Sequence, residues 1–159
     1  ADTLSGGWAL YLERRLFVAT DDDAERHAAL LRRRQAIAAA RVDLDLHCGT
    51  IDATAAAARM QALSQSSVSN SLHQVAQVVR HPGDALAVVL GWQLIEAAAA
   101  RDGGPDAAVL HQRLLGQGAI PLSLVMTHAV GDTHWQAALS AVGLGSDAGA
   151  NASARRATG

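Results

Sequence analysis

The sequence predicts an all-α protein, a single helical domain of six or seven helices. Half of the 159 residues are apolar but only 3% are aromatic, so alanine, leucine and valine must form most of the core. Such a composition favours helices, because alanine loses no side-chain entropy in a helix. Apolar residues also recur at helical spacing between segments rich in glycine, proline and aspartate, and no segment has the alternation of a strand.

The first expected helix covers residues 8–19, with Trp8, Leu12 and Leu16 on one face. Asp22 is expected to cap the next helix, because Asp side chains accept hydrogen bonds from the first free amides of a helix. This helix should run to about residue 46.

Within it, Leu30, Ile37 and Leu44 recur every seven residues and, joined by Leu31, Ala38 and Val42, predict a continuous apolar stripe. Gly49 is expected to end the helix, since glycine readily adopts the left-handed conformation found at helix ends.

The later helices are separated by clear stop signals. Pro82 should lie in the first turn of a long helix. Residues from Gly143 onward are mostly small and polar, which predicts a helical domain at 1–142 and a disordered tail at 143–159. The expected helices are 50–63 (capped by Thr50), 68–81, 82–101, 105–115 and a short final helix from Pro121.

The overall charge excludes several classes of partner. A formal charge of −2 and an isoelectric point near 6.4 give no attraction to nucleic acid or anionic membranes. No apolar run is long enough to cross a bilayer. No leader of signal-peptide form is visible, so a cytoplasmic location is the default expectation. The chain opens at Ala1, not methionine, which is typical of a processed or incomplete gene product.

Four segments resemble motifs of one bacterial family. Residues 5–13 read Ser-Gly-Gly-Trp-Ala-Leu-Tyr-Leu-Glu and resemble a Ser-Glu-Gly-Trp-Ala-x-Tyr-x-Glu motif. Residues 81–86 resemble a Pro-Gly-Gln-Ala segment, and residues 111–122 resemble Phe-His-x-x-Leu-Leu-x-x-Gly-x-x-Pro-Leu. Residues 43–47 fall where the family has Asp-Thr-Gly-x-His. Order and spacing agree over about residues 5–125, and the family is domain of unknown function 885.

The resemblance implies a zincin-like helical fold and a metallopeptidase-like activity, with this chain as the C-terminal part. Such enzymes hold zinc with two histidines and a distant glutamate and leave one position for water. The metal acidifies that water, and a tyrosine or histidine stabilises the oxyanion. Tyr11 and Glu13 match the family motif and are expected to have structural roles here.

The sequence departs from the family pattern at the positions that matter for catalysis. The His-Glu zinc helix, which lies upstream in the family, is missing from the sequence. The expected third zinc ligand is replaced by Gly6, and a Tyr-Lys pair is replaced by Val88 and Val89. The chain is therefore expected to bind no cofactor, zinc being implied only for the family it resembles.

The remaining weak candidates for a catalytic role are Asp43, His47 and His111. Asp43 and His47 are four residues apart and share a helix face, so they could orient a substrate or supply two metal ligands. The favoured interpretation is a hydrogen bond that fixes the turn at Gly49. His111 could line the ancestral cleft or bond a backbone carbonyl.

Three functions remain open. The first is the inactive C-terminal part of a metallopeptidase-like protein, completed by an upstream segment or a second chain. The second is a non-catalytic helical interaction module, a pseudoenzyme that binds a protein or small molecule in the inherited cleft. The third is an enzyme with changed chemistry. An intact upstream His-Glu helix would favour the first, and an exposed apolar face would show as self-association.

Overall fold

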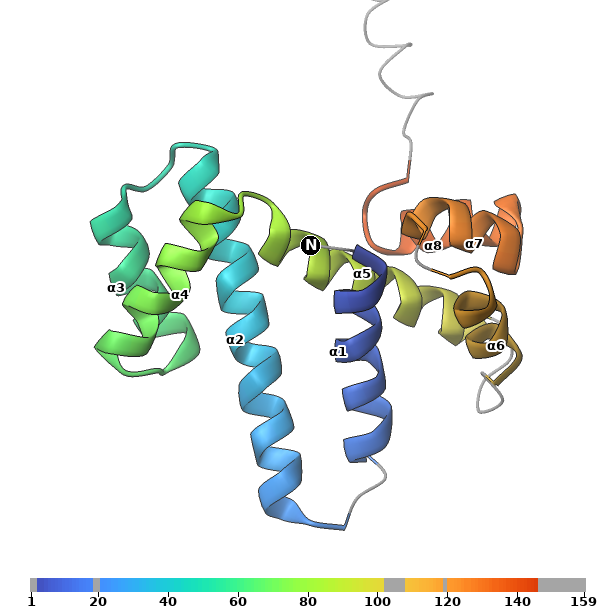
Figure 1. The fold of residues 1–159 in the computed structure, drawn as a ribbon, viewed down its shortest axis with the longest axis horizontal. Coiled ribbons are helices and arrows are strands. Elements are labelled where there is room, and N and C mark those ends of the chain that lie inside the picture. Colours follow the sequence, from blue (N-terminus) through green and yellow to red (C-terminus); the bar gives the residue numbers. More distant parts are fainter. Residues whose placement is uncertain (1–2, 19–20, 102–107, 119, 146–159) are drawn as a thin grey trace, which may run out of the picture. The chain divides into compact units, whose positions relative to one another are not determined.

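The computed structural model describes residues 3–18, 21–101, 108–118 and 120–145. The predicted all-α class is confirmed, and these ranges contain eight helices (Figure 1). The chain divides into two compact units, Ala1–Ile95 and Glu96–Gly159. The helices are α1 (Thr3–Val18), α2 (Asp23–His47), α3 (Ala53–Ser64), α4 (Val68–Arg80), α5 (Asp84–Arg101), α6 (Ala108–Gly116), α7 (Leu122–Val130) and α8 (Asp132–Ala141).

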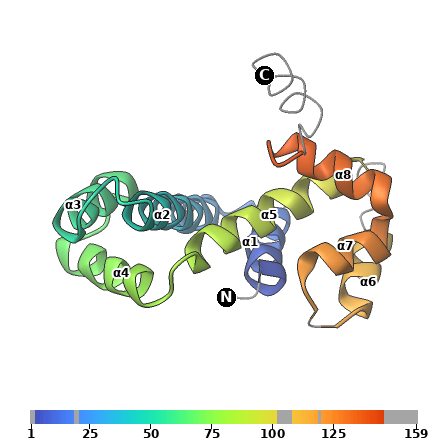
Figure 2. The same cartoon turned by 90° about the horizontal axis from the view of Figure 1, so that it is seen from above.

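In the first unit, α3 and α4 pack against α2 (Figure 1). Their shared core consists of small and medium side chains, which lets the helices approach closely and bury most of the apolar surface between them. The buried members of this cluster are Ala38, Val42, Ala56, Met60, Val75 and Val78. In the second unit, α6 contacts α7 and α7 contacts α8 (Figure 2).

Helix α1 lies directly on α5 through glycines. A Cβ atom added to Gly7 would lie 2.5 Å from the backbone nitrogen of Trp92 and would also collide with the backbone of Gly91. A Cβ atom on Gly91 would collide with the Thr3 carbonyl. The two backbones therefore touch, which only glycine permits.

The buried face of α1 differs from the expected one. Tyr11 is fully buried, stacks near Trp8 with ring centroids 5.6 Å apart and lies under the Arg15 guanidinium, whereas Leu16 is exposed. Glu13 forms an ion pair with Arg32 of α2. The glycine contact with α5 turns the Gly7–Tyr11 side of the helix inward.

Both ends of α2 match their predicted signals. The Asp22 side chain accepts hydrogen bonds from the amides of Ala24 and Glu25. At the other end Gly49 has a φ angle of +73°, and its amide donates to the Leu46 carbonyl. The following amide donates to the Asp45 carbonyl, which completes a Schellman motif.

The prediction that Thr50 caps the third helix was wrong. The Thr50 amide and hydroxyl both donate to the Asp45 carbonyl and so complete the end of α2. Asp52 caps α3 instead, because its carboxylate accepts from the Ala55 amide.

The serine-rich connection between α3 and α4 is held by hydroxyl groups. Ser64 Oγ lies 2.7 Å from Ser66 Oγ, which lies 2.9 Å from Ser71 Oγ. Ser64 donates to the Met60 carbonyl and Ser71 to that of Ser67. Ser64 and Ser71 are buried, so these hydrogen bonds satisfy groups that water cannot reach.

The predicted apolar stripe on α2 faces the core only in part. Leu30, Ile37 and Leu44 are 57%, 46% and 44% exposed. Ala38 and Val42, which belong to the same predicted stripe, are buried. Both lines are apolar and share the helical period, and the smaller side chains allow closer packing of α3 and α4.

The expected final helix is two helices in the structure. Gly131 has a φ angle of +81° and separates α7 from α8, which raises the number of described helices above the predicted seven. Pro105, expected to open α6, lies outside the described residues. The predicted tail is described only at residues 143–145, so the domain boundary at 142 stays a prediction.

Among the described helices, none is both long and apolar enough to cross a membrane by itself. Helices α4 and α5 pass that test only as a bent pair, by length and composition, with 89° between them.

Candidate functional site

The segment between α4 and α5 forms a tight turn. The Asp84 amide donates to the His81 carbonyl over 3.2 Å, and Gly83 has a φ angle of +82°. Proline followed by glycine with positive φ is the pattern of a type II turn. Pro82 therefore lies in the turn and not, as expected, in the first turn of α5.

The carboxylate of Asp43, on α2, holds this turn. Asp43 is only 2% exposed, and its Oδ1 atom accepts from the Gly83 amide over 2.9 Å. Its Oδ2 atom accepts from the Leu86 amide over 3.2 Å. The carboxylate thus fills the N-cap role for α5 from another helix, where its charge also complements the helix dipole.

His47 completes the arrangement around Asp43. Its Nδ1 atom lies 2.8 Å from Asp43 Oδ1 and 2.9 Å from the Asp43 carbonyl oxygen. Both neighbours are acceptors, which assigns the proton to Nδ1. The predicted hydrogen bond between the two side chains is present, but the turn that Asp43 contacts is the one at Gly83, not that at Gly49.

The three candidate residues are therefore only partly brought together. Asp43 and His47 meet in the first unit, whereas His111 lies half-buried on α6 in the second. Both oxygens of Asp43 are occupied by donors, which leaves the carboxylate poorly suited to act as a base or ligand. Among the described residues, no group of three His, Cys, Asp or Glu side chains is arranged to hold a metal.

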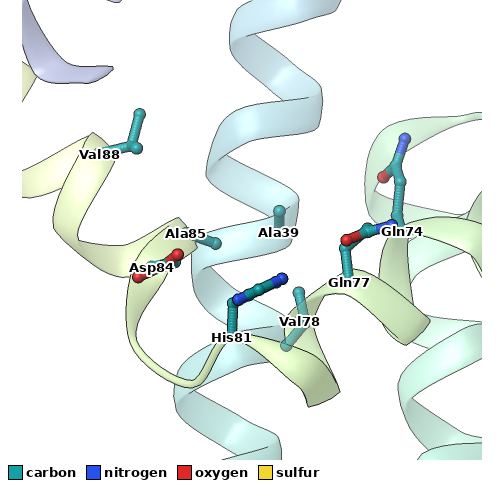
Figure 3. Close-up of a pocket in the computed structure, with 8 residues that line it drawn as sticks. All are labelled: Ala39, Gln74, Gln77, Val78, His81, Asp84, Ala85 and Val88. Atoms are coloured by element: carbon teal, nitrogen blue, oxygen red, sulfur yellow. The ribbon is translucent and has the colours of Figure 1, made fainter. Parts of the chain in front are cut away.

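A pocket of about 330 Å³ adjoins the turn (Figure 3). Side chains from α4 line one side and side chains from α5 the other, with Ala39 of α2 between them. The Oε1 atom of Gln74 is buried there and accepts no hydrogen bond from the described residues. The lining residues are Ala39, Gln74, Gln77, Val78, His81, Asp84, Ala85 and Val88. Sequence reasoning did not find this pocket, since its residues come from three helices.

Val88 also contacts the residue that departs most from the family pattern. A Cβ atom added to Gly6 would lie 2.5 Å from Val88 Cγ2. Two of the three positions that depart from the motifs therefore touch, although 82 positions separate them in the sequence.

Asp45 forms a second buried carboxylate cluster that the sequence analysis did not assign. Its Oδ2 atom accepts from Arg41 Nε over 2.8 Å and from Arg59 over 2.5 Å, which ties α2 to α3. The hydrogen bond from Arg41 is the main reason that the pKa of Asp45 lies below its usual value, and it raises the pKa of Arg41. The four-residue spacing of Arg41 and Asp45 was the signal available in the sequence.

This shift predicts an acid-sensitive contact. Because the folded state lowers the pKa of Asp45, its stabilisation is complete above the unfolded pKa and is lost as pH falls through the folded value. Between roughly pH 5 and pH 2, we expect the native chain to lose stability more steeply than Asp45→Asn. Urea midpoints across that range measure the difference. Asp23→Asn, which alters an exposed pair with Arg26, should follow the native slope. Parallel curves for the native chain and Asp45→Asn would contradict the prediction.

Comparison with protein families gives one match. The model of the family described as "Bacterial protein of unknown function (DUF885)" matches residues 2–128, well over half of the chain. Comparison with curated proteins and with solved structures gives no match. The matched range includes both motifs that meet at Gly6 and Val88. It also includes Asp43 and the turn that its carboxylate binds. This chain belongs to the DUF885 family of bacterial proteins.

Proposed function

We propose that the chain is the C-terminal, substrate-cleft portion of a metallopeptidase-like protein and that it holds no catalytic zinc by itself. The observation that carries this proposal is the contact between Gly6 and Val88. The family resemblance assigns a glutamate zinc ligand to the first position and an oxyanion-stabilising tyrosine to the second. Their proximity is what a shared catalytic site would require.

The residues now at this point do not fit a zinc ion. Glycine has no side chain to coordinate metal, and valine offers neither a ligand nor a hydrogen-bond donor. Val88 also occupies the space that the first carbon of a side chain at position 6 would need. The His-Glu-x-x-x-Gly-His pattern of the family does not occur in this sequence. These features support an inherited cleft without the catalytic groups.

The metal content of the purified chain tests the proposal. After equilibration with zinc and exhaustive dialysis, elemental mass spectrometry should give far less than one zinc per chain. One tightly held zinc per chain would overturn the proposal and would move Asp43, His47 and His111 to the head of the ligand candidates.

Restoring the missing glutamate should not recruit zinc either. We expect Gly6→Glu to remain without stoichiometric zinc, because one carboxylate cannot replace a set of three ligands. The double variant Gly6→Glu with Val88→Ala removes the collision with Val88 Cγ2 and keeps the test independent of misfolding. Gly6→Gln with Val88→Ala is the matched control, of similar size without the charge. Zinc bound by the Glu form but not by the Gln form would contradict the proposal.

A second candidate function is ligand binding without catalysis. The pocket beside the turn favours it, because about 330 Å³ is the size of a small-molecule site and its lining combines apolar side chains with the polar groups of Gln77 and His81.

A further inference from the structure

A groove on α2 lies apart from the pocket and the Asp43 clamp. It has a volume of about 580 Å³ and combines apolar with cationic side chains. We call it the arginine groove, and its lining residues are Leu30, Arg33, Arg34, Ile37, Ala38, Arg41 and Leu63.

The apolar part of the groove repeats at the spacing of helix pairing. Leu30 and Ile37 line it, and Leu44 continues the same seven-residue line along α2. All three are about half exposed, as single large apolar side chains on other described helices also are, but on α2 they share one line. Residues seven positions apart lie on one helix face, so the line offers apolar contacts to a second helix, with the three arginines of the groove between them.

The cationic part is only partly neutralised within the chain. Arg41 pairs with Asp45, but Arg33 and Arg34 have no carboxylate partner among the described residues. Arg34 donates to the Leu63 carbonyl over 2.5 Å. The Arg33 guanidinium lies 5.1 Å from the centre of the Trp92 ring, and its buried Nε atom makes no hydrogen bond in this part of the structure.

We propose that the arginine groove binds an amphipathic helix of another protein, one that carries Asp or Glu beside its apolar seam. The apolar line requires a partner with leucine-like side chains at three- and four-residue spacing. The two guanidinium groups without a carboxylate select for acidic residues flanking that seam, and would repel a basic helix. This interaction is independent of the proposed peptidase-like function, since it uses none of the residues at Gly6, Val88 or the turn.

A designed peptide pair tests the proposal. The probe is a fluorescently labelled helix of three heptads, about 21 residues, with leucine at the a and d positions and glutamate at e and g. Its counterpart has lysine in place of every glutamate. Fluorescence anisotropy with the full chain should show at least about tenfold tighter binding of the glutamate peptide, and the difference should shrink as salt is added.

Two variants assign the binding to the groove. Ile37→Ser should weaken binding of the glutamate peptide by about tenfold or more. Leu72→Ser, at a similarly exposed site on α4, should leave that binding unchanged. Arg33→Met keeps an unbranched side chain but removes the charge, and should reduce the preference for glutamate over lysine. Because Ile37 and Leu72 are exposed, circular dichroism should show native helix content in both serine variants.

Three results would overturn the proposal. The first is equal binding of the two peptides, and the second is unchanged binding in Ile37→Ser. The third is concentration-dependent dimerisation of the chain, seen by analytical ultracentrifugation and abolished by Ile37→Ser, because a second copy would then be the occupant. Tighter binding of the glutamate peptide than of the lysine peptide by the native chain, together with weaker binding in Ile37→Ser, supports an acidic helical partner.

Discussion

Replacing Asp43 with alanine is expected to lower the free energy of unfolding by about 3 kcal/mol or more. The change removes a carboxylate that caps α5 and leaves the amides of Gly83 and Leu86 without this acceptor. It also removes the carboxylate partner of His47 and leaves that ring only the carbonyl oxygen of residue 43. Urea denaturation at neutral pH, followed by circular dichroism, measures the loss.

Asp22→Ala is the matched control. Asp22 also caps a helix with its carboxylate, but it is exposed, so its loss should cost only about 1 kcal/mol. The difference between the two losses in the free energy of unfolding therefore measures the effect of burial beyond that of capping. If Asp43→Ala cost no more than Asp22→Ala, the carboxylate would not hold the turn as described.

Gly7→Ala is expected to destabilise the chain by about 3 kcal/mol, although alanine favours helices over glycine by about 1 kcal/mol. The added methyl group would meet the backbone of Gly91 and Trp92, which cannot move aside as a flexible side chain would. Helix α1 would have to separate from α5. The loss should appear in thermal unfolding, together with a change in the near-ultraviolet signal of Trp92.

Gly116→Ala separates this effect from ordinary helix propensity. Gly116 is the last residue of α6, and a Cβ atom there would meet no atom within 4 Å. This substitution should be neutral or slightly stabilising. A Gly7→Ala protein as stable as the native chain would show that α1 can shift on α5 at little cost.

The helices themselves could be predicted from the sequence because their signals are local. Asp22 and Gly49 lie at the ends of α2, and each marks its helix end through atoms only a few residues away. The break at Gly131 shows the limit of this reasoning. A single glycine between two short apolar segments does not reveal from sequence alone whether the helix continues.

Which face of a helix is buried was harder to predict than the helix itself. On α2, Ile37 and Ala38 belong to one predicted apolar stripe, but Ala38 is buried and the larger Ile37 is about half exposed. Side-chain size and burial do not run in parallel where helices pack closely on alanine.

The candidate site also combines contacts that could be predicted from the sequence with contacts that could not. The Asp43–His47 hydrogen bond follows from four-residue spacing on one helix and was predictable. The amides that Asp43 binds lie 40 and 43 residues further along the chain. The contact of Gly6 with Val88 is equally remote. A single sequence does not show that such remote positions lie together. The one signal for Gly6 and Val88 is that both depart from the motifs of the family that the chain resembles.

The Asp43 carboxylate also links the start of α5 to a distant segment of the chain during folding. The segment before Asp84 supplies Pro82 and Gly83, neither of which has a side chain that could accept a hydrogen bond from the first amides of the helix. The acceptor for the Gly83 and Leu86 amides comes from α2, so these two amides gain their hydrogen bonds only after a loop of 40 residues has closed. One carboxylate therefore makes the start of a helix, normally a local event, depend in part on a distant segment of the chain.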